Sequence, residues 1–289
     1  MREMWDGSLT HRLDEIRIDA SRPLATTVNE VVLQLRRFGF ALLRGLARDN
    51  ADAPQKLCSL GSALGRIVAQ SPLGELLEDV RDFSDVEARD DRGYRSRGEL
   101  APHSDPSTVI GLHCLQPAKS GGETSIVNVD AIYARLQADS PDLAACLFGD
   151  FPVWEVAGQH GIAEARPAAS GRPVLAMRDG VLSCVIYRPF IERAAAAAGA
   201  PLDARQVAAL DAFERASKAP DLTLRFHLRR GDTMLLNNRA VLHARTDYED
   251  WPEPDRRRHL LRVWVDAPRI LPVAQTHALG DLFAEPLAS

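Results

Sequence analysis

The chain has 289 residues, of which 45% are hydrophobic and 26% are charged, and its formal net charge is -5 at pH 7. This length supplies enough apolar area for a large packed core, and the acidic balance argues against nucleic-acid binding, which normally needs a basic surplus. The charged N-terminus lacks the apolar segment of a secretory signal, and no run approaches the roughly 20 apolar residues that span a bilayer. We therefore expect no nucleic-acid or membrane partner, and the sequence leaves the oligomeric state open.

Cysteine usage indicates the redox compartment of the protein. None of the four cysteines forms a Cys-x-x-Cys pair or a zinc-finger spacing with another, as the positions Cys58, Cys114, Cys146 and Cys184 show. Reduced, mostly buried thiols are typical of a cytosolic protein. We expect a cytoplasmic protein.

The first half of the chain predicts helices followed by strands. Residues 26–37 place apolar side chains at helical spacing, and residues 54–64 predict a second helix. Short strands are expected at 40–43, 108–115 and 124–129, with Asp130 as the cap of a helix after the last. Residues 83–101 are polar and aperiodic, and a loop of this length usually carries function or is mobile.

The second half adds more short strands and a pair of helices. Strands are expected at 149–157, 173–177, 181–187, 222–228, 233–236, 240–243 and 260–265. Helices are expected at 193–200 and 203–218, the second capped by Asp203, which makes a helical insertion near 189–218. Strands joined by Gly, Pro and Asp turns favour an antiparallel two-sheet roll with flanking helices in one domain, 1–289. A doubly wound fold would need regular strand–helix alternation and a glycine-rich phosphate loop.

A pair of residues that precedes the strand expected at 108–115 suggests a metal centre. His103 and Asp105 are two apart, so in an extended segment both side chains project to the same side. Two histidines and one carboxylate on one face of the metal are typical of non-haem iron(II) oxygenases. The other histidines of the core and C-terminal region are candidates for the third ligand: His113, His160, His227, His243, His259 and His277. We favour His243, because it ends an apolar strand and precedes an arginine-bearing strand.

That last strand predicts an anion site. By the two-residue period, Arg258, Leu260, Arg262 and Trp264 share one face. If this face lines the interior, each guanidinium needs an anion, because an unpaired buried charge is costly. A dicarboxylate co-substrate supplies one, and an acidic group on the substrate could meet the other. At roughly 3.3 Å per residue the two arginines are about 13 Å apart, too far to share one carboxylate head-on.

Four segments of the chain carry motifs that occur in this order: 98–105 (GELAPHSD), 120–124 (SGGET), 231–246 (GDTMLLNNRAVLHART) and 258–264 (RHLLRVW). Together they resemble the taurine dioxygenase-like and clavaminate synthase-like family of 2-oxoglutarate oxygenases. The resemblance implies a mainly β fold with flanking α-helices around a double-stranded β-helix, the cupin-like jelly roll. It also implies Fe(II) held by His103, Asp105 and His243, with 2-oxoglutarate and O2 as co-substrates.

The resemblance also implies roles for single residues. Thr124 and Arg258 match positions that hold the far carboxylate of 2-oxoglutarate. Arg262 matches a position that binds either the co-substrate or an anionic substrate group, and Arg245 matches one that reaches the substrate. The 83–101 loop, with Tyr94 and Arg97, would form a lid or substrate wall; an ordinary mobile surface loop is the alternative.

The function expected from the resemblance is a dioxygenase that hydroxylates, desaturates or cyclises a small anionic or amino-acid-like molecule, in specialised-metabolite biosynthesis. Two alternatives remain open from the residues. One is a cupin-like metalloenzyme that does not use 2-oxoglutarate, and Thr124 and Arg258 count against it. The other is a non-catalytic jelly-roll binding protein, and the complete set of His103, Asp105 and His243 counts against that.

Overall fold

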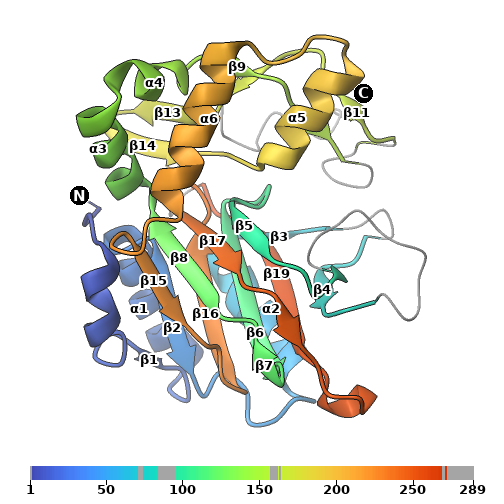
Figure 1. The fold of residues 1–289 in the computed structure, drawn as a ribbon. Coiled ribbons are helices and arrows are strands. Elements are labelled where there is room, and N and C mark those ends of the chain that lie inside the picture. The colour runs from blue at the N-terminus through green and yellow to red at the C-terminus, as the bar shows by residue number, and fades with distance from the viewer. Residues whose placement is uncertain are drawn as a thin grey trace, which may run out of the picture.

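The computed structural model describes residues 2–70, 74–83, 95–156, 162, 164–268 and 271. Its lower half is built from two sheets (Figure 1). The larger sheet has the order β1 (Ile18–Asp19), β2 (Phe40–Arg44), β16 (Asp232–Asn237), β6 (Val109–Gln116), β19 (His259–Asp266) and β3 (Arg66–Val68), with β4 (Leu77–Val80) also paired to β19. The smaller sheet has the order β15 (Thr223–Phe226), β8 (Thr124–Asn128), β17 (Val241–Arg245) and β5 (Leu100–His103). All of these pairs are antiparallel except β1 with β2.

The two sheets share one apolar core. Ile110, Met234 and Trp264 from the larger sheet belong to the same buried cluster as Ile126 and Leu224 from the smaller sheet. Burial of this kind stabilises a fold by roughly 25 cal/mol per Å² of apolar area removed from water.

Two helices cover the outer face of the larger sheet. They are α1 (Leu24–Arg37) and α2 (Ala53–Leu64), and a 3-10 helix, η1 (Gly7–Arg12), precedes them. Leu35 of α1 and Leu57 of α2 pack in one cluster with Val263 and Val265 of β19. The odd-numbered side chains of β19 therefore face the helices, which leaves Arg258, Leu260, Arg262 and Trp264 facing the interior.

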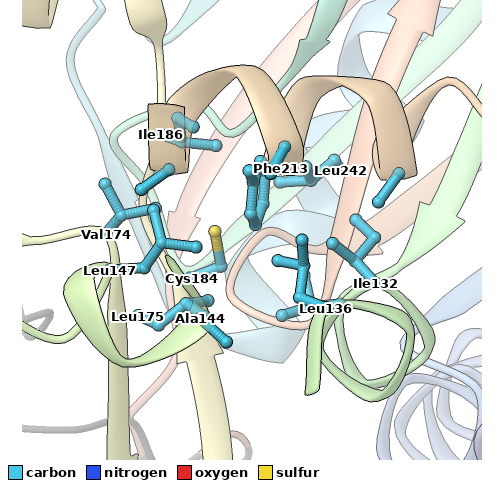
Figure 2. Close-up of a cluster of buried hydrophobic side chains, with 14 of the residues drawn as sticks. Ile132, Leu136, Ala144, Leu147, Val174, Leu175, Cys184, Ile186, Phe213 and Leu242 are labelled. Carbon is cyan, nitrogen blue, oxygen red and sulfur yellow. The ribbon is translucent and has the colours of Figure 1, made fainter. Parts of the chain in front are cut away.

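Between β8 and β15 the chain builds an upper layer (Figure 1). It contains α3 (Val129–Asp139), α4 (Pro141–Cys146), α5 (Arg188–Ala197) and α6 (Ala204–Ser217), with the short strands β9 (Asp150–Phe151), β10 (Trp154–Glu155), β11 (Arg166–Pro167), β12 (Arg172–Pro173), β13 (Leu175–Arg178) and β14 (Val181–Cys184). Figure 2 shows Phe213, Ile132 and Cys184 of this layer packed around Leu242 of β17. The upper layer thus shares a core with the smaller sheet.

The predicted class, mostly β with flanking helices, is confirmed, but several predicted boundaries are wrong. Asn128, not Asp130, caps α3, because its side chain accepts hydrogen bonds from the backbone N–H groups of residues 130 and 131. The strand predicted at 149–157 is two short strands, since Pro152 removes a backbone donor between them. α5 starts at Arg188 instead of residue 193, with Pro189 in its first turn, where proline is tolerated.

Candidate functional site

A cavity of about 580 Å³ lies between the sheets and the upper layer. Its walls combine strand residues such as Leu112 and Leu260 with upper-layer residues such as Trp154 and Ile191. Of the residues predicted to bind metal, co-substrate or substrate, seven line it: His103, Asp105, Thr124, His243, Arg245, Arg258 and Arg262.

The three predicted metal ligands meet in this cavity. β5 and β17 are neighbours, and His103 pairs with His243 in their register, which brings the ring centroids to 4.3 Å. Asp105 follows β5 by two residues, and its Oδ1 lies 3.7 Å from Nε2 of His103. One ligand atom from each residue lies within 4.8 Å of the other two.

The donor chemistry of this set fits iron(II). Nδ1 of His103 lies 2.9 Å from the carbonyl oxygen of Ala101, a contact that leaves Nε2 as the nitrogen facing Asp105. Burial, and then the neighbouring His103, lower the pKa of His243 to about 3, so this ring is neutral at pH 7. Nδ1 of His243 is buried and has no hydrogen-bond partner among the residues that the structure describes. Two imidazoles and one carboxylate form the facial set that non-haem iron(II) enzymes use.

A hydrogen-bonded network keeps Asp105 ionised. Its Oδ2 accepts a hydrogen bond from Nε1 of Trp264 at 2.9 Å and lies 3.3 Å from Nη1 of Arg262. Gln70 locks Arg262 in turn, because its Oε1 accepts from Nε of Arg262 at 2.7 Å and its amide donates to the Arg262 carbonyl at 2.9 Å. Burial alone would raise the pKa of Asp105, but the charge of Arg262 and the other contacts outweigh it and lower that pKa.

A second arginine supports the same ligand through the backbone. Arg239 is buried, and its two Nη atoms donate to the carbonyl oxygens of Asp105 at 3.1 Å and Pro106 at 2.8 Å. These bonds fix the turn that carries Asp105 against the end of β16. Sequence reasoning missed the supporting roles of Trp264, Gln70 and Arg239; only Trp264 gave a signal, because it shares a strand face with Arg262.

A basic pocket lies farther along the strands. Thr124 of β8 is the register partner of Arg245 of β17, and both are buried. The Arg245 and Arg258 guanidiniums lie 4.9 Å and 5.1 Å from the ring centroid of Tyr248. Within the described ranges, Nη1 of Arg258 and both Nε and Nη1 of Arg245 are buried without hydrogen-bond partners. Such a pocket fits a carboxylate, because buried guanidinium groups need an anionic partner.

A glycine turn borders this pocket. β7 (Ser120–Gly121) pairs with β18 (Tyr248–Glu249). Gly121 has φ +69°, and a Cβ there would overlap the carbonyl oxygen of Asp247. Glycine is therefore required at Gly121, and the close approach places Tyr248 beside Arg258.

The remaining predicted residues lie elsewhere. Arg97 is exposed, forms an ion pair with Asp82 and is not among the residues lining the cavity. Tyr94 lies outside the described residues, as do most of the 83–101 loop and two of the candidate histidines, His160 and His277. His113 is buried 2.8 Å from the Thr233 hydroxyl, and His259 lies 2.6 Å from Asp79, so neither joins the metal cluster.

Comparison with known proteins identifies the family. The sequence profile described as "Taurine catabolism dioxygenase TauD, TfdA family" matches residues 7–264, and the chain belongs to this family. The predicted class, a 2-oxoglutarate-dependent non-haem iron dioxygenase acting on small molecules, is thereby confirmed, together with its need for iron and 2-oxoglutarate.

Individual relatives agree with this class. The chain is 30% identical to FR-33289 synthase of Streptomyces rubellomurinus over 83% of this chain and 72% of that protein. It is 32% identical to a taurine hydroxylase-like protein of Stachybotrys chartarum over 78% of this chain and 60% of that protein. It is also 28% identical to a uridine-5'-phosphate dioxygenase of Amycolatopsis over 83% and 90%.

Solved structures show the same fold at lower identity. An asparagine oxygenase in complex with Fe(II), 3-hydroxyasparagine and succinate matches with a TM-score of 0.62 and 18% identity, over 91% of this chain and 93% of that chain. A non-haem iron oxygenase, OrfP, in complex with iron and alpha-ketoglutaric acid matches with a TM-score of 0.60 and 18% identity, over 94% of this chain and 90% of that chain.

Among the described residues, no helix combines the length and apolar character needed to cross a membrane.

Proposed function

We propose that His103, Asp105 and His243 hold the catalytic Fe(II) of a 2-oxoglutarate-dependent dioxygenase. The observation that carries this proposal is the convergence of the three ligand atoms within 4.8 Å of one another in a cavity large enough for two small molecules. When bound, iron and 2-oxoglutarate would together activate O2: one oxygen atom would end in succinate as carbon dioxide is released, and the other would end in the hydroxylated substrate or, for desaturation or ring closure, in water.

The basic pocket supports a site for the co-substrate. We infer that Arg258, with Thr124, binds the far carboxylate of 2-oxoglutarate. Nη1 of Arg258 is buried and unpaired within the described chain, whereas Arg262 contacts both Asp105 and Gln70. Arg258 is therefore better suited to grip a separate carboxylate, and Arg262 to orient the metal-binding carboxylate. Arg245, next to Thr124 in the register, faces the same region of the cavity.

The finer features of the fold belong to the same proposal. The two antiparallel sheets that enclose the cavity support a double-stranded β-helix, the cupin-like jelly roll. The helices α5 and α6 fit the predicted insertion near 189–218, and the core that they share with β17 supports one domain over residues 1–289. A cytoplasmic location remains a prediction from the sequence.

The substrate that we propose is a small anionic or amino-acid-like molecule of a biosynthetic pathway, hydroxylated, desaturated or cyclised by the enzyme. One relative is named for uridine-5'-phosphate, one structural neighbour is named for asparagine, and another was solved in complex with hydroxyarginine; all three are polar small molecules. Arg245 at the cavity wall, whose Nε and Nη1 have no hydrogen-bond partner among the described residues, is consistent with a substrate that carries a negative group.

The first test is spectroscopic and needs no substrate. Wild-type protein, titrated anaerobically with Fe(II) and then 2-oxoglutarate, should develop the visible charge-transfer band of the chelated co-substrate. His243→Ala should lose the band, and Arg258→Gln should need a much higher 2-oxoglutarate concentration to reach it. Arg178→Gln, an exposed site on β13, should behave as wild type. A full band in His243→Ala would remove the assignment, and a larger co-substrate defect in Arg262→Gln than in Arg258→Gln would reverse the roles of the two arginines.

A further inference from the structure

A fourth arginine, Arg172, faces the cavity from the upper layer. Arg172 lies in β12, which pairs with β9, and its side chain is partly buried and lines the cavity. Its side chain makes no hydrogen bond or ion pair with the described residues. Burial lowers the pKa of Arg172, and Cys184 is the only group that opposes this shift. The positive charge of Arg172 is therefore uncompensated by the residues that the structure describes.

Its surroundings add positive charge instead of removing it. The pKa of Arg239 is lowered to about 9, first by burial and then by the nearby charge of Arg172. Nε of Arg239 has no hydrogen-bond partner among the described residues. Burial raises the pKa of the Cys184 thiol well above its usual value, so this neighbour stays neutral. Two guanidinium groups thus lie close together with no thiolate to balance them.

The acidic residues of the same wall do not neutralise Arg172. Glu155 lines the cavity but pairs with Arg166 at 2.8 Å. Asp150 also lines the cavity and forms no ion pair with Arg172. A guanidinium removed from bulk water is costly without an anion, so the open cavity in front of Arg172 favours an anionic ligand.

The co-substrate anion belongs at a different place. Arg262 and Trp264 of β19 contact the side chain of Asp105, whereas Arg258 immediately precedes this strand, four residues before Arg262. At about 3.3 Å per residue, four residues of extended chain span at most roughly 13 Å. Arg239, the neighbour of Arg172, contacts the backbone of Asp105. Arg172, in β12 of the upper layer, and Arg258, beside β19 of the larger sheet, therefore face the cavity from different walls.

We infer that Arg172 binds the anionic group of the substrate, a compact oxyanion such as a phosphate, a phosphonate or a carboxylate. This inference rests on the proposed function and names the substrate-recognition residue of the same site. Tyr187 and Phe190 line the same cavity and stack edge to face at 4.6 Å, and the Tyr187 ring lies 5.5 Å from that of His103. A short carbon skeleton anchored at Arg172 would pack against these rings on its way to the metal ligands.

The test measures anion binding directly, in the anaerobic protein loaded with Fe(II) and saturating 2-oxoglutarate so that the Arg258 pocket is filled. Inorganic phosphate, methylphosphonate and acetate are titrated separately by calorimetry in the millimolar range, where a one-group fragment is expected to bind. At least one of them should bind wild type and Arg178→Gln alike, and the strongest names the oxyanion. Arg172→Gln should weaken its binding by about tenfold or more, and Arg172→Lys should recover part of the loss because the charge is kept.

Two readouts separate failure of this inference from failure of the proposed function. The charge-transfer band of the Fe(II)–2-oxoglutarate complex should be the same in wild type and Arg172→Gln, which also shows that the variant is folded. Absence of the band in wild type would refute the proposed function. With the band intact, equal oxyanion affinity in wild type and Arg172→Gln, or no binding of any of the three probes to wild type, would overturn the inference.

Discussion

At the residue scale, the chemistry of the site depends on how Asp105 is held. A buried carboxylate resists ionisation, yet Arg262, the two imidazoles and the Trp264 N–H together keep its pKa below the ordinary value. The same contacts fix the orientation of the carboxylate before any metal arrives. Outer contacts of this kind typically change metal affinity by roughly ten- to hundredfold when they are removed.

Trp264→Phe tests this support. The substitution keeps an aromatic ring on β19 but removes the hydrogen bond to Asp105, so metal affinity should fall roughly ten- to hundredfold in an anaerobic Fe(II) titration. Trp5→Phe is the matched control, because Nε1 of buried Trp5 donates to the Phe38 carbonyl at 2.6 Å, away from the metal cluster. Both variants should lose roughly 1–2 kcal/mol of stability, but only Trp264→Phe should bind iron more weakly. Equal iron affinity in the two variants would show that the Trp264 bond is irrelevant to the metal.

The sequence predicted residues that lie in recognisable strand patterns, including His243 at the end of an apolar strand, and it missed residues that act only through distant contacts. His103 and Asp105 were accessible because they are two residues apart in an extended segment. The contact between Gln70, which follows β3, and Arg262 of β19 spans 192 positions, and no motif links the two segments. Arg172 had no sequence signal at all, because its position in the cavity depends on how the upper layer folds back over the sheets.

At the element scale, the upper layer depends on α6. Asp203 caps this helix in a capping box, in which its carboxylate accepts from the Gln206 N–H and the Gln206 side chain accepts from the Asp203 N–H. Phe213 of α6 then fills the core shown in Figure 2. α6 therefore couples a local sequence signal to the core of the upper layer.

Asp203→Ala should lower the free energy of unfolding by about 1 kcal/mol, because a helix N–H loses its acceptor. Asp52→Ala is the control, since Asp52 precedes α2 but makes no side-chain capping bond. Urea unfolding followed by circular dichroism measures both. A loss in Asp52→Ala as large as that in Asp203→Ala would contradict the capping account.

Prediction of elements succeeded where one signal dominated and failed where two competed. The final strand and α6 were predicted within two residues, because apolar alternation and the Asp203 cap each have a single interpretation. Asp130 looked like a helix cap, but Asn128 ends β8 and caps α3 in one step. The strand at 149–157 failed because its apolar pattern hid the effect of Pro152.

At the scale of the whole molecule, the metal joins strands that are far apart in sequence. His103 and His243 pair across β5 and β17, so metal binding should tie these strands together and stabilise the folded state. A ligand present at about 100 times its Kd stabilises by about 2.7 kcal/mol when it binds only the folded state.

Fe(II) added anaerobically should therefore raise the melting temperature of wild type and of the control variant His227→Ala. His227 is exposed and directly follows β15 of the smaller sheet. Fe(II) should not raise the melting temperature of His243→Ala. Differential scanning calorimetry with and without a chelator measures the shift. An equal rise in His243→Ala would place the stabilising metal at another site.

The most direct measurement is a crystal structure of the anaerobic protein with Fe(II) and 2-oxoglutarate. We expect iron within bonding distance of His103, Asp105 and His243, and the far carboxylate of 2-oxoglutarate against Arg258 and Thr124. Iron bound by any other set of side chains, or a co-substrate carboxylate remote from Arg258, would contradict the account.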